Sequence, residues 1–258
     1  MAGTAPKDRR DLDVVLASCS GNQYHAAFGS SKDRCRNMFN EILHAVSSPR
    51  IASTRNHLVE GFLKTPHKWM LMVDSDMVFD ATDVVTLIDT AEADGHHILG
   101  GLYFGGAPDG HVFPQIYALV EGEDGHQALE SPTGCGGEEG VWGDILECHA
   151  TGAGFLLVSR WALETIGEKY KDMAHQWFAE SGHTSEYGED VTFCLRAIDL
   201  GIKIHVHTGV VLGHCKQAVL DDQSYAEYLG KLAHMTKEQI SREQLVRAKV
   251  LTEGDVEN

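Results

Sequence analysis

Short apolar runs alternate with segments of helical periodicity along the first 216 residues of the chain. The apolar run that starts at Trp69 and ends in Asp74-Ser75-Asp76 has the length of a fully buried strand. Other extended segments are expected at residues 13–18, 97–103, 113–120, 155–158 and 202–208. Helices are expected at residues 31–46, 54–63, 82–92, 159–166 and 188–200. This alternation predicts an α/β fold with a mostly parallel central sheet flanked by helices.

The pattern also divides the chain into parts. Residues 1–12 are polar and charged and are expected to form a flexible lead-in, and residues 13–216 form one domain. Residues 121–143 read as a long loop rich in Gly, Glu and Asp. From residue 217 the sequence is charged and helix-prone, which predicts a helical C-terminal extension through which a homo-oligomer could form.

Composition narrows the class of protein. No apolar run approaches the ~20 residues that cross a bilayer, and the N-terminus lacks the apolar core of a secretory signal. Six cysteines are scattered without a Cys-x-x-Cys pair, so neither a zinc ribbon nor a disulfide framework is indicated. We therefore expect a cytoplasmic protein with reduced thiols and no membrane span.

The net charge of −17 restricts the ligands. Binding of polyanions through charge alone requires clustered Lys and Arg, and here 21 of these face 38 acidic residues. An anionic ligand therefore needs a metal ion or a local basic group.

Asp74 and Asp76 are the first candidates for such chemistry. Ligands of α/β sheets bind beyond the carboxyl ends of the strands, and residues two apart on a strand share a side. Two carboxylates placed in this way form an oxygen site for a hard divalent ion. The alternative is an acidic turn that leads into the next helix.

Four features follow one another along the chain: Arg55-Asn56, Asp74-Ser75-Asp76, TGAGF at 151–155, and GEDVTFCLRAIDLG at 188–201 followed by Gly213-His214. In this combination the sequence resembles the metal-dependent glycosyltransferases of the GT-A fold, particularly the small single-domain enzymes of bacterial and phage genomes. The resemblance covers residues 12–216. It implies transfer of a sugar from a nucleotide-diphosphate donor to an acceptor hydroxyl. A UDP-sugar is the expected donor, because UDP-sugars are common donors in this family.

The resemblance also implies roles for individual residues. The metal ligands would be Asp74, Asp76 and His214, and this mixed oxygen and nitrogen set favours Mn²⁺ over Mg²⁺. Asp190 would be the catalytic base, with Glu189 as its neighbour or an acceptor contact. If the reaction retains configuration, Asp190 would instead position a substrate. The residues expected to bind the donor are Ser18, Cys19, Ser20, Arg55, Asn56, Asp74, Ser75, Gly101, Gly152 and Gly154.

The sequence departs from the family at one point, because no clear second strand ends in an Asp that could read uracil. Two alternatives stay open, and a third is disfavoured. The Asp-x-Asp segment also fits haloacid-dehalogenase-like phosphatases, in which Asp74 would be a nucleophile and Asp76 a general acid. A second alternative is a nucleotide- or carbohydrate-binding module without turnover. A sugar-nucleotide-forming nucleotidyltransferase is disfavoured, since SCSGNQ at 18–23 is a poor glycine-rich phosphate loop.

The acceptor is the least defined partner. A saccharide, a small molecule, a protein or a hydroxymethylated phage DNA base would each suit such an enzyme. Because the chain is acidic, a small or presented hydroxyl is expected in preference to duplex DNA.

Overall fold

The computed structural model describes residues 12–20, 25–46, 50–106, 112–121, 127–131, 143–180 and 187–216. All of these residues except Lys216 belong to one compact unit, which ends at Cys215. Leu12, the last residue of the predicted lead-in, is buried. The rest of the lead-in and the predicted helical extension lie outside the described residues, so the extension stays a prediction.

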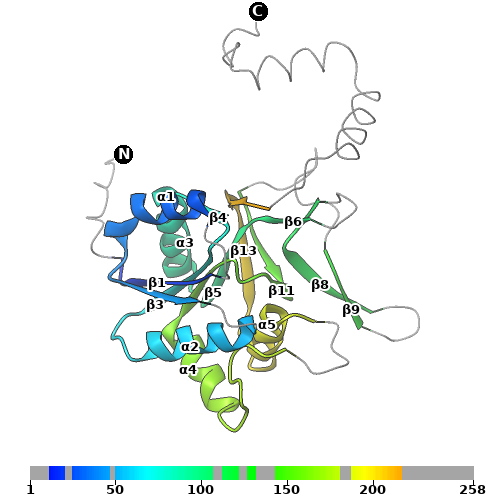
Figure 1. The fold of residues 1–258 in the computed structure, drawn as a ribbon. Helices are drawn as coiled ribbons and strands as arrows, with labels where there is room; N and C mark the ends of the chain where they lie inside the picture. The colour runs from blue at the N-terminus through cyan, green and yellow to red at the C-terminus, as the bar shows by residue number, and fades with distance from the viewer. Residues whose placement is uncertain are drawn as a thin grey trace, which may run out of the picture. The chain divides into compact units, whose positions relative to one another are not determined.

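A seven-stranded sheet forms the centre of this unit (Figure 1). Its strands are β1 (Val14–Ser20), β2 (Glu41–Val46), β3 (Trp69–Asp74), β5 (Ile98–Leu102), β10 (Ile145–Cys148), β12 (Phe155–Ser159) and β13 (Ile204–Val211). Their order across the sheet is β10-β13-β5-β12-β3-β1-β2. Only β10 and β12 run against the other strands. The predicted α/β fold with a mostly parallel central sheet is confirmed.

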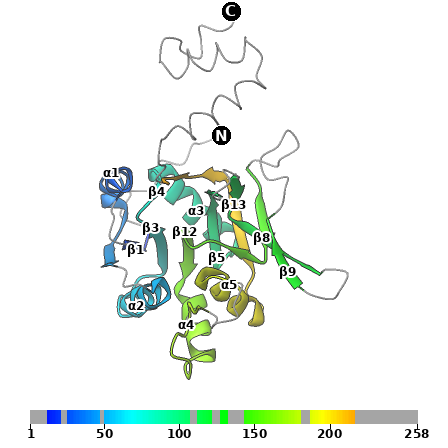
Figure 2. The same cartoon turned by 45° about the vertical axis from the view of Figure 1, so that its right-hand side comes forward.

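Helices cover both faces of the sheet (Figures 1 and 2). One face is covered by α1 (Ala26–Arg34) and α3 (Ala81–Asp94), and the other by α2 (Ile51–Leu63), α4 (Arg160–Lys169) and α5 (Glu189–Asp199). A capping box at Asp80 and Asp83 starts α3, because each side chain accepts a hydrogen bond from the backbone of the other. Gly95, at φ 73°, ends this helix in the left-handed conformation that glycine adopts without strain.

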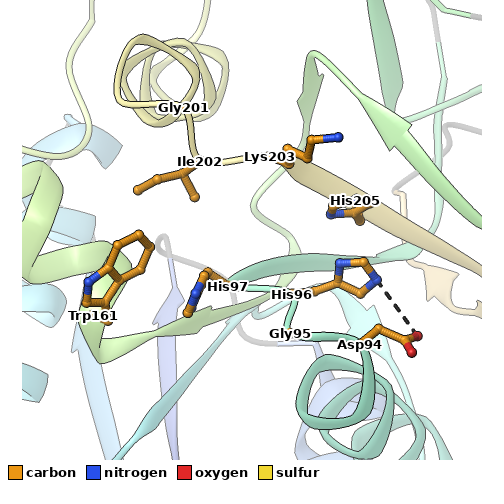
Figure 3. A pocket seen from close by; sticks show the side chains of 9 residues that line it. All are labelled: Asp94, Gly95, His96, His97, Trp161, Gly201, Ile202, Lys203 and His205. Atoms are coloured by element: carbon orange, nitrogen blue, oxygen red, sulfur yellow. Dashed lines mark ion pairs between the residues drawn. The ribbon is translucent and has the colours of Figure 1, made fainter.

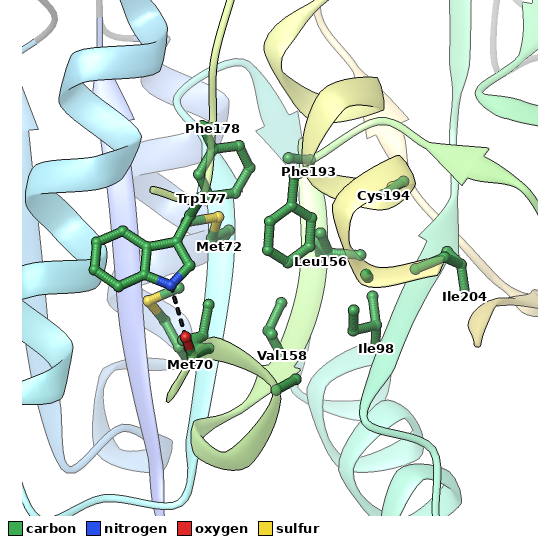
Figure 4. Close-up of a cluster of buried hydrophobic side chains, with 14 of the residues drawn as sticks. Met70, Met72, Ile98, Leu156, Val158, Trp177, Phe178, Phe193, Cys194 and Ile204 are labelled. Atoms are coloured by element: carbon green, nitrogen blue, oxygen red, sulfur yellow. Dashed lines mark hydrogen bonds between the residues drawn. The ribbon is translucent and has the colours of Figure 1, made fainter. Parts of the chain in front are cut away.

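Side-chain alternation along the strands builds two separate hydrophobic clusters. On β1, Val15 and Ala17 join the cluster under α2, α4 and α5, whereas Val14 and Leu16 join the cluster under α1 and α3. Figure 4 shows part of the first cluster, where the indole N–H of Trp177 donates to the Leu163 carbonyl at 2.7 Å. Two buried faces explain why these strands read as continuous apolar runs.

Smaller sheets lie beside the central one. β8 (Ile116–Glu121) pairs with β9 (Gln127–Glu130) and with β11 (Ala150–Thr151), and β6 (Phe104–Gly106) pairs with β7 (Val112–Pro114). The short ribbon of β4 (Met77–Val78) and β14 (Gly213–His214) brings the end of the domain back to the Asp74-Ser75-Asp76 segment.

The predicted helix at 31–46 is wrong. The chain forms the end of α1, a 3-10 turn at Arg36–Met38 and then β2, which pairs in parallel with β1. β2 is the edge strand and most of its residues are half-exposed, so its apolar positions lack the pattern of a buried strand. A second strand does follow the first, but it ends at Val46 and not at an Asp, in agreement with the expectation that no second strand ends in an Asp that could read uracil.

Two further boundaries differ from expectation. The predicted loop at 121–143 contains β9, and part of that loop lies outside the described residues. α2 starts at Ile51, before the predicted helix start at Thr54. Within the described part of the chain, no helix is long and apolar enough to span a membrane.

Candidate functional site

The carboxyl ends of β1 and β3 place the first candidate residues side by side. Cys19 lies opposite Asp74 in the parallel register, and the Cys19 thiol donates a hydrogen bond to Asp74 Oδ1 at 3.2 Å. β3 ends at Asp74, and Ser75 and Asp76 form a turn. The strand alternation that predicted a shared side for Asp74 and Asp76 therefore stops before it reaches Asp76.

Arg55 is the centre of the buried part of the site. Its Nη2 donates to both carboxylate oxygens of Asp74 at 3.0 and 3.1 Å, and its Nη1 donates to the Ala153 carbonyl at 2.9 Å. Its Nε lies 3.1 Å from Glu189 Oε1, an ion pair without hydrogen-bond alignment. One guanidinium with an exposed fraction of 4% thus joins α2, β3 and the start of α5.

Burial and charge shift the pKa values in this group. Burial alone would lower the pKa of Arg55, but Asp74, Cys19 and Glu189 raise it above the ordinary value, so Arg55 is a permanent cation. Burial, with the charge of Asp74, raises the pKa of Cys19 to about 12, so this thiol stays protonated. Burial also raises the pKa of Glu189, although Arg55 opposes this rise.

Asp76 and His214 form a second pair, outside this buried group. His214 Nε2 lies 3.2 Å from Asp76 Oδ2, and His214 Nδ1 lies 2.7 Å from the Phe104 carbonyl oxygen. The pairing of β14 with β4 sets His214 opposite Met77, next to Asp76. The Tyr103 ring stands edge-on to the imidazole at a centroid distance of 5.3 Å.

The contacts of His214 define its tautomer. Because a carbonyl oxygen can only accept, Nδ1 carries the proton that lies toward Phe104. In a neutral imidazole, Nε2 then presents a lone pair to Asp76, whose carboxylate also only accepts. A proton or a metal ion between the two atoms resolves this arrangement. A backbone carbonyl that holds the second ring nitrogen is the usual support of a metal-binding histidine.

The predicted ligand set is brought together only in part. Among the residues that the structure describes, no group of three or more His, Cys, Asp and Glu side chains is arranged to hold a metal ion. Asp76 and His214 are together, whereas both Asp74 oxygens accept hydrogen bonds from Arg55. The donor set of Asp76 and His214 fits a divalent ion that takes its remaining ligands from phosphate and water.

Glu189 and Asp190 occupy the first turn of α5. Asp190 Oδ1 accepts the backbone N–H of Val191 at 2.8 Å, and Asp190 is half-buried. The positive end of the helix dipole stabilises both carboxylates. Asp190 also contributes to the raised pKa of Tyr103, after burial and the charge of Asp74, and to the raised pKa of Tyr117, after burial.

Two serines of β1 share one partner on β2. The hydroxyls of Ser18 and Ser20 lie 2.9 and 3.2 Å from the two ring nitrogens of His44. Burial, and to a smaller extent Lys32, lowers the pKa of His44, so the ring is neutral at pH 7. The edge where a nucleoside was expected therefore carries a fixed array of hydroxyl and imidazole groups.

Asn56 and Ser75 have backbone partners. The Asn56 amide donates to the carbonyls of Ala52 and Phe178 at 2.7 and 2.6 Å and accepts the N–H of Trp177 at 3.1 Å. Asn56 thereby fixes the segment that follows α4. Ser75 is buried, and its carbonyl accepts the N–H of His25 at 3.3 Å.

The three candidate glycines serve close packing. A Cβ atom on Gly101 would lie 2.8 Å from Leu212 Cδ1. Tyr103 fills the space beside Gly152 and Gly154, and a Cβ on either glycine would collide with its hydroxyl. The Gly154 N–H donates to the Tyr103 hydroxyl at 3.1 Å.

Sequence reasoning missed Tyr103 and His44 as parts of this edge. The spacing of Gly152 and Gly154 is a signal that a large group packs against both, but it does not say which one. His44 was hidden by the wrong helix at 31–46.

In sequence comparisons, no known protein family and no curated protein matches the chain. Solved structures with a similar fold include A197 from STIV, at 14% identity and a TM-score of 0.52, over 79% of this chain and 86% of that chain. They also include GalNAc-T7, solved with UDP, GalNAc and Mn²⁺, at 9% identity and a TM-score of 0.51, over 79% of this chain and 44% of that chain. At such identities the similarity shows the fold, and it confirms the GT-A-like architecture.

Proposed function

We propose that the protein is a divalent-metal-dependent glycosyltransferase that moves a sugar from a nucleotide diphosphate, expected to be UDP, to an acceptor hydroxyl. The observation that carries this proposal is the Asp76–His214 pair, an oxygen and a nitrogen donor 3.2 Å apart that could share a divalent ion. GalNAc-T7, which shares the fold, was solved with UDP and Mn²⁺, and this supports a nucleotide-sugar ligand here.

Mn²⁺ is the cation that best suits one carboxylate and one imidazole, and Asp76 and His214 would hold it. When bound, it offsets the charge that develops on the leaving diphosphate. Asp74 would act beside this cation as a fixed hydrogen-bond acceptor for the sugar nucleotide. Arg55 holds the Asp74 carboxylate in place, and 26% of the Asp74 side chain is exposed. Arg55 itself would support donor binding through Asp74, since its own groups are buried.

Asp190 would receive the proton of the acceptor hydroxyl as that oxygen attacks the anomeric carbon. Its position at the helix N-terminus fixes one oxygen through the Val191 N–H. Glu189, held by Arg55, would border the acceptor. Acidic groups on the acceptor side favour a neutral hydroxyl compound over a phosphate-rich one.

The phosphatase alternative fits the geometry less well. Asp74 would have to attack phosphorus with one oxygen, but both oxygens accept hydrogen bonds from Arg55 and one also accepts the Cys19 thiol. An attacking carboxylate held in this way is a weakened nucleophile.

Separate measurements of donor binding and transfer test the proposal. Asp190→Asn is expected to keep the affinity for UDP and to lose transfer by about 10²–10⁴-fold, because a base acts in the transition state. Asp33→Asn, at an exposed position, is the matched control and should change neither quantity.

Transfer would be measured with radiolabelled UDP-sugars against a panel of saccharides, peptides and hydroxymethylated DNA. Equal turnover of wild type and Asp190→Asn would leave Asp190 with a helix-capping role only. Metal-dependent binding of UDP without transfer to any acceptor would favour the binding module, and phosphate release from simple phosphomonoesters would favour the phosphatase.

A further inference from the structure

Two adjoining hollows lie at the amino ends of the parallel strands, whereas the candidate site lies at their carboxyl ends. Their lining residues come from the starts of β5, β13 and α4 and from the segments that follow α3 and α5. The larger hollow has a volume of about 370 Å³ and the smaller one about 180 Å³. Both include Gly95, His96, His97 and Trp161 in their walls, and Figure 3 shows the larger one. The larger volume lies in the range of small-molecule sites.

The two hollows share an exposed aromatic wall. Trp161 has an exposed fraction of 51%, whereas Trp69 and Trp177 are buried. The indole packs against the His97 ring at a centroid distance of 4.2 Å, and His97 Nδ1 is held by Ser159 Oγ at 3.0 Å. The wall is thus a supported apolar surface that remains open to solvent. Such surfaces bind ligands that offer an apolar face together with polar edges.

Three histidines, His96, His97 and His205, supply polar groups around this wall. His96 and His205 stack with their ring centroids 3.9 Å apart. Burial is the main cause that lowers the pKa of His97 and of His205. Lys68 adds to this effect at His97, whereas the Glu147 carboxylate opposes it at His205. The neutral rings of His97 and His205 each carry one donor and one acceptor nitrogen, of which His97 Nδ1 is held by Ser159. The remaining nitrogens complement hydroxyl groups, which also donate and accept.

The charges at the hollows are balanced in pairs. Lys203 Nζ lies 2.6 Å from Glu147, and Lys68 Nζ lies 2.9 Å from Glu92. Arg160 donates to the carbonyls of residues on the α2–β3 connection. Because each cation is already neutralised or hydrogen-bonded, the hollows lack the free positive charge that phosphate or polyanion binding requires.

We propose that these hollows bind a neutral oligosaccharide, with Trp161 and His97 between two neighbouring sugar rings. A sugar presents C–H groups on its face and hydroxyls around its edge, which matches an aromatic wall surrounded by donors and acceptors. The size of the two hollows, their shared wall and their balanced charge all fit a short uncharged chain. This inference does not depend on the proposed transfer reaction, because the two sites lie at opposite ends of the strands.

Calorimetry with maltohexaose, cellohexaose and chitohexaose, without nucleotide or metal, tests the inference. At least one of the three should bind wild type with a Kd in the micromolar to millimolar range. Trp161→Ala should weaken this binding about tenfold, and Trp161→Phe, which keeps an aromatic ring, should retain most of it. Met173→Ala is the control, because Met173 is also 51% exposed and lies outside both hollows.

Three outcomes would overturn the inference: no binding of any of the three oligosaccharides, binding that Trp161→Ala leaves unchanged, or binding of inorganic phosphate in their place. Asp76→Asn should bind the oligosaccharides as wild type does. Loss of UDP binding in that variant with retained oligosaccharide binding would separate the two sites experimentally.

Discussion

At the scale of single residues, Arg55 shows what the sequence can and cannot reveal. Its place before the central strand suggested an anion-binding group, and the structure gives it two protein carboxylates, those of Asp74 and Glu189. The local sequence could not show this, because Glu189 reaches Arg55 only through the packing of α5. The nearby Asp76–His214 pair likewise depends on the β4–β14 ribbon.

Removal of the Arg55 charge should be costly. Arg55→Gln leaves Asp74 and Glu189 without their cation in a buried space, which should lower the free energy of unfolding by about 3–5 kcal/mol. Arg36→Gln, at an exposed position, should change it by less than about 0.5 kcal/mol. Urea denaturation at pH 7 measures both variants. Equal stability of the two would mean that the buried cation is dispensable.

At the scale of elements, the sequence predicts those helices and strands whose burial produces a regular pattern of apolar residues. β1 and β3 are buried on both faces and were found as apolar runs, whereas β2 at the sheet edge was taken for a helix. Gly152 and Gly154 were expected to contact the donor, whereas in the structure the group that approaches their backbone is Tyr103. Sequence alone could not say that the approaching group is Tyr103, because side-chain packing across strands decides it.

A double-mutant cycle tests this packing. Gly152→Ala should destabilise the protein by about 1–3 kcal/mol, because the new Cβ collides with the Tyr103 hydroxyl. In a Tyr103→Phe background the cost should be clearly smaller, since the hydroxyl is gone. Gly61→Ala, inside α2 with its nearest contact at 3.4 Å, should be neutral or stabilising by up to about 1 kcal/mol. The same cost of Gly152→Ala in both backgrounds would contradict the packing account.

At the scale of the whole molecule, fold class and charge were readable from sequence, and the chemistry of the site was readable only as a set of candidates. The net charge of −17 argues that ligand anions are held locally and not by a general basic surface. This is consistent with a site in which Arg55 is buried and a bound cation would face the donor.

The same charge predicts weak binding to DNA. Unmodified duplex DNA should bind with a Kd weaker than about 10⁻⁴ M at physiological salt, at or beyond the weak limit of nonspecific DNA-binding proteins. Fluorescence anisotropy with a labelled duplex measures this at two salt concentrations. Micromolar affinity with a steep salt dependence would instead point to a local basic patch and to a DNA acceptor.

The measurement that bears most directly on the central claim is calorimetric binding of UDP with and without Mn²⁺. Wild type should bind UDP only when Mn²⁺ is present. Asp76→Asn and His214→Gln should each weaken this binding by more than about tenfold. Both variants should retain wild-type unfolding curves. His57→Gln, with a side chain 76% exposed, should behave as wild type. If Asp76→Asn and His214→Gln bind UDP with unchanged Mn²⁺ dependence, Asp76 and His214 do not form the metal site and the proposed mechanism is contradicted.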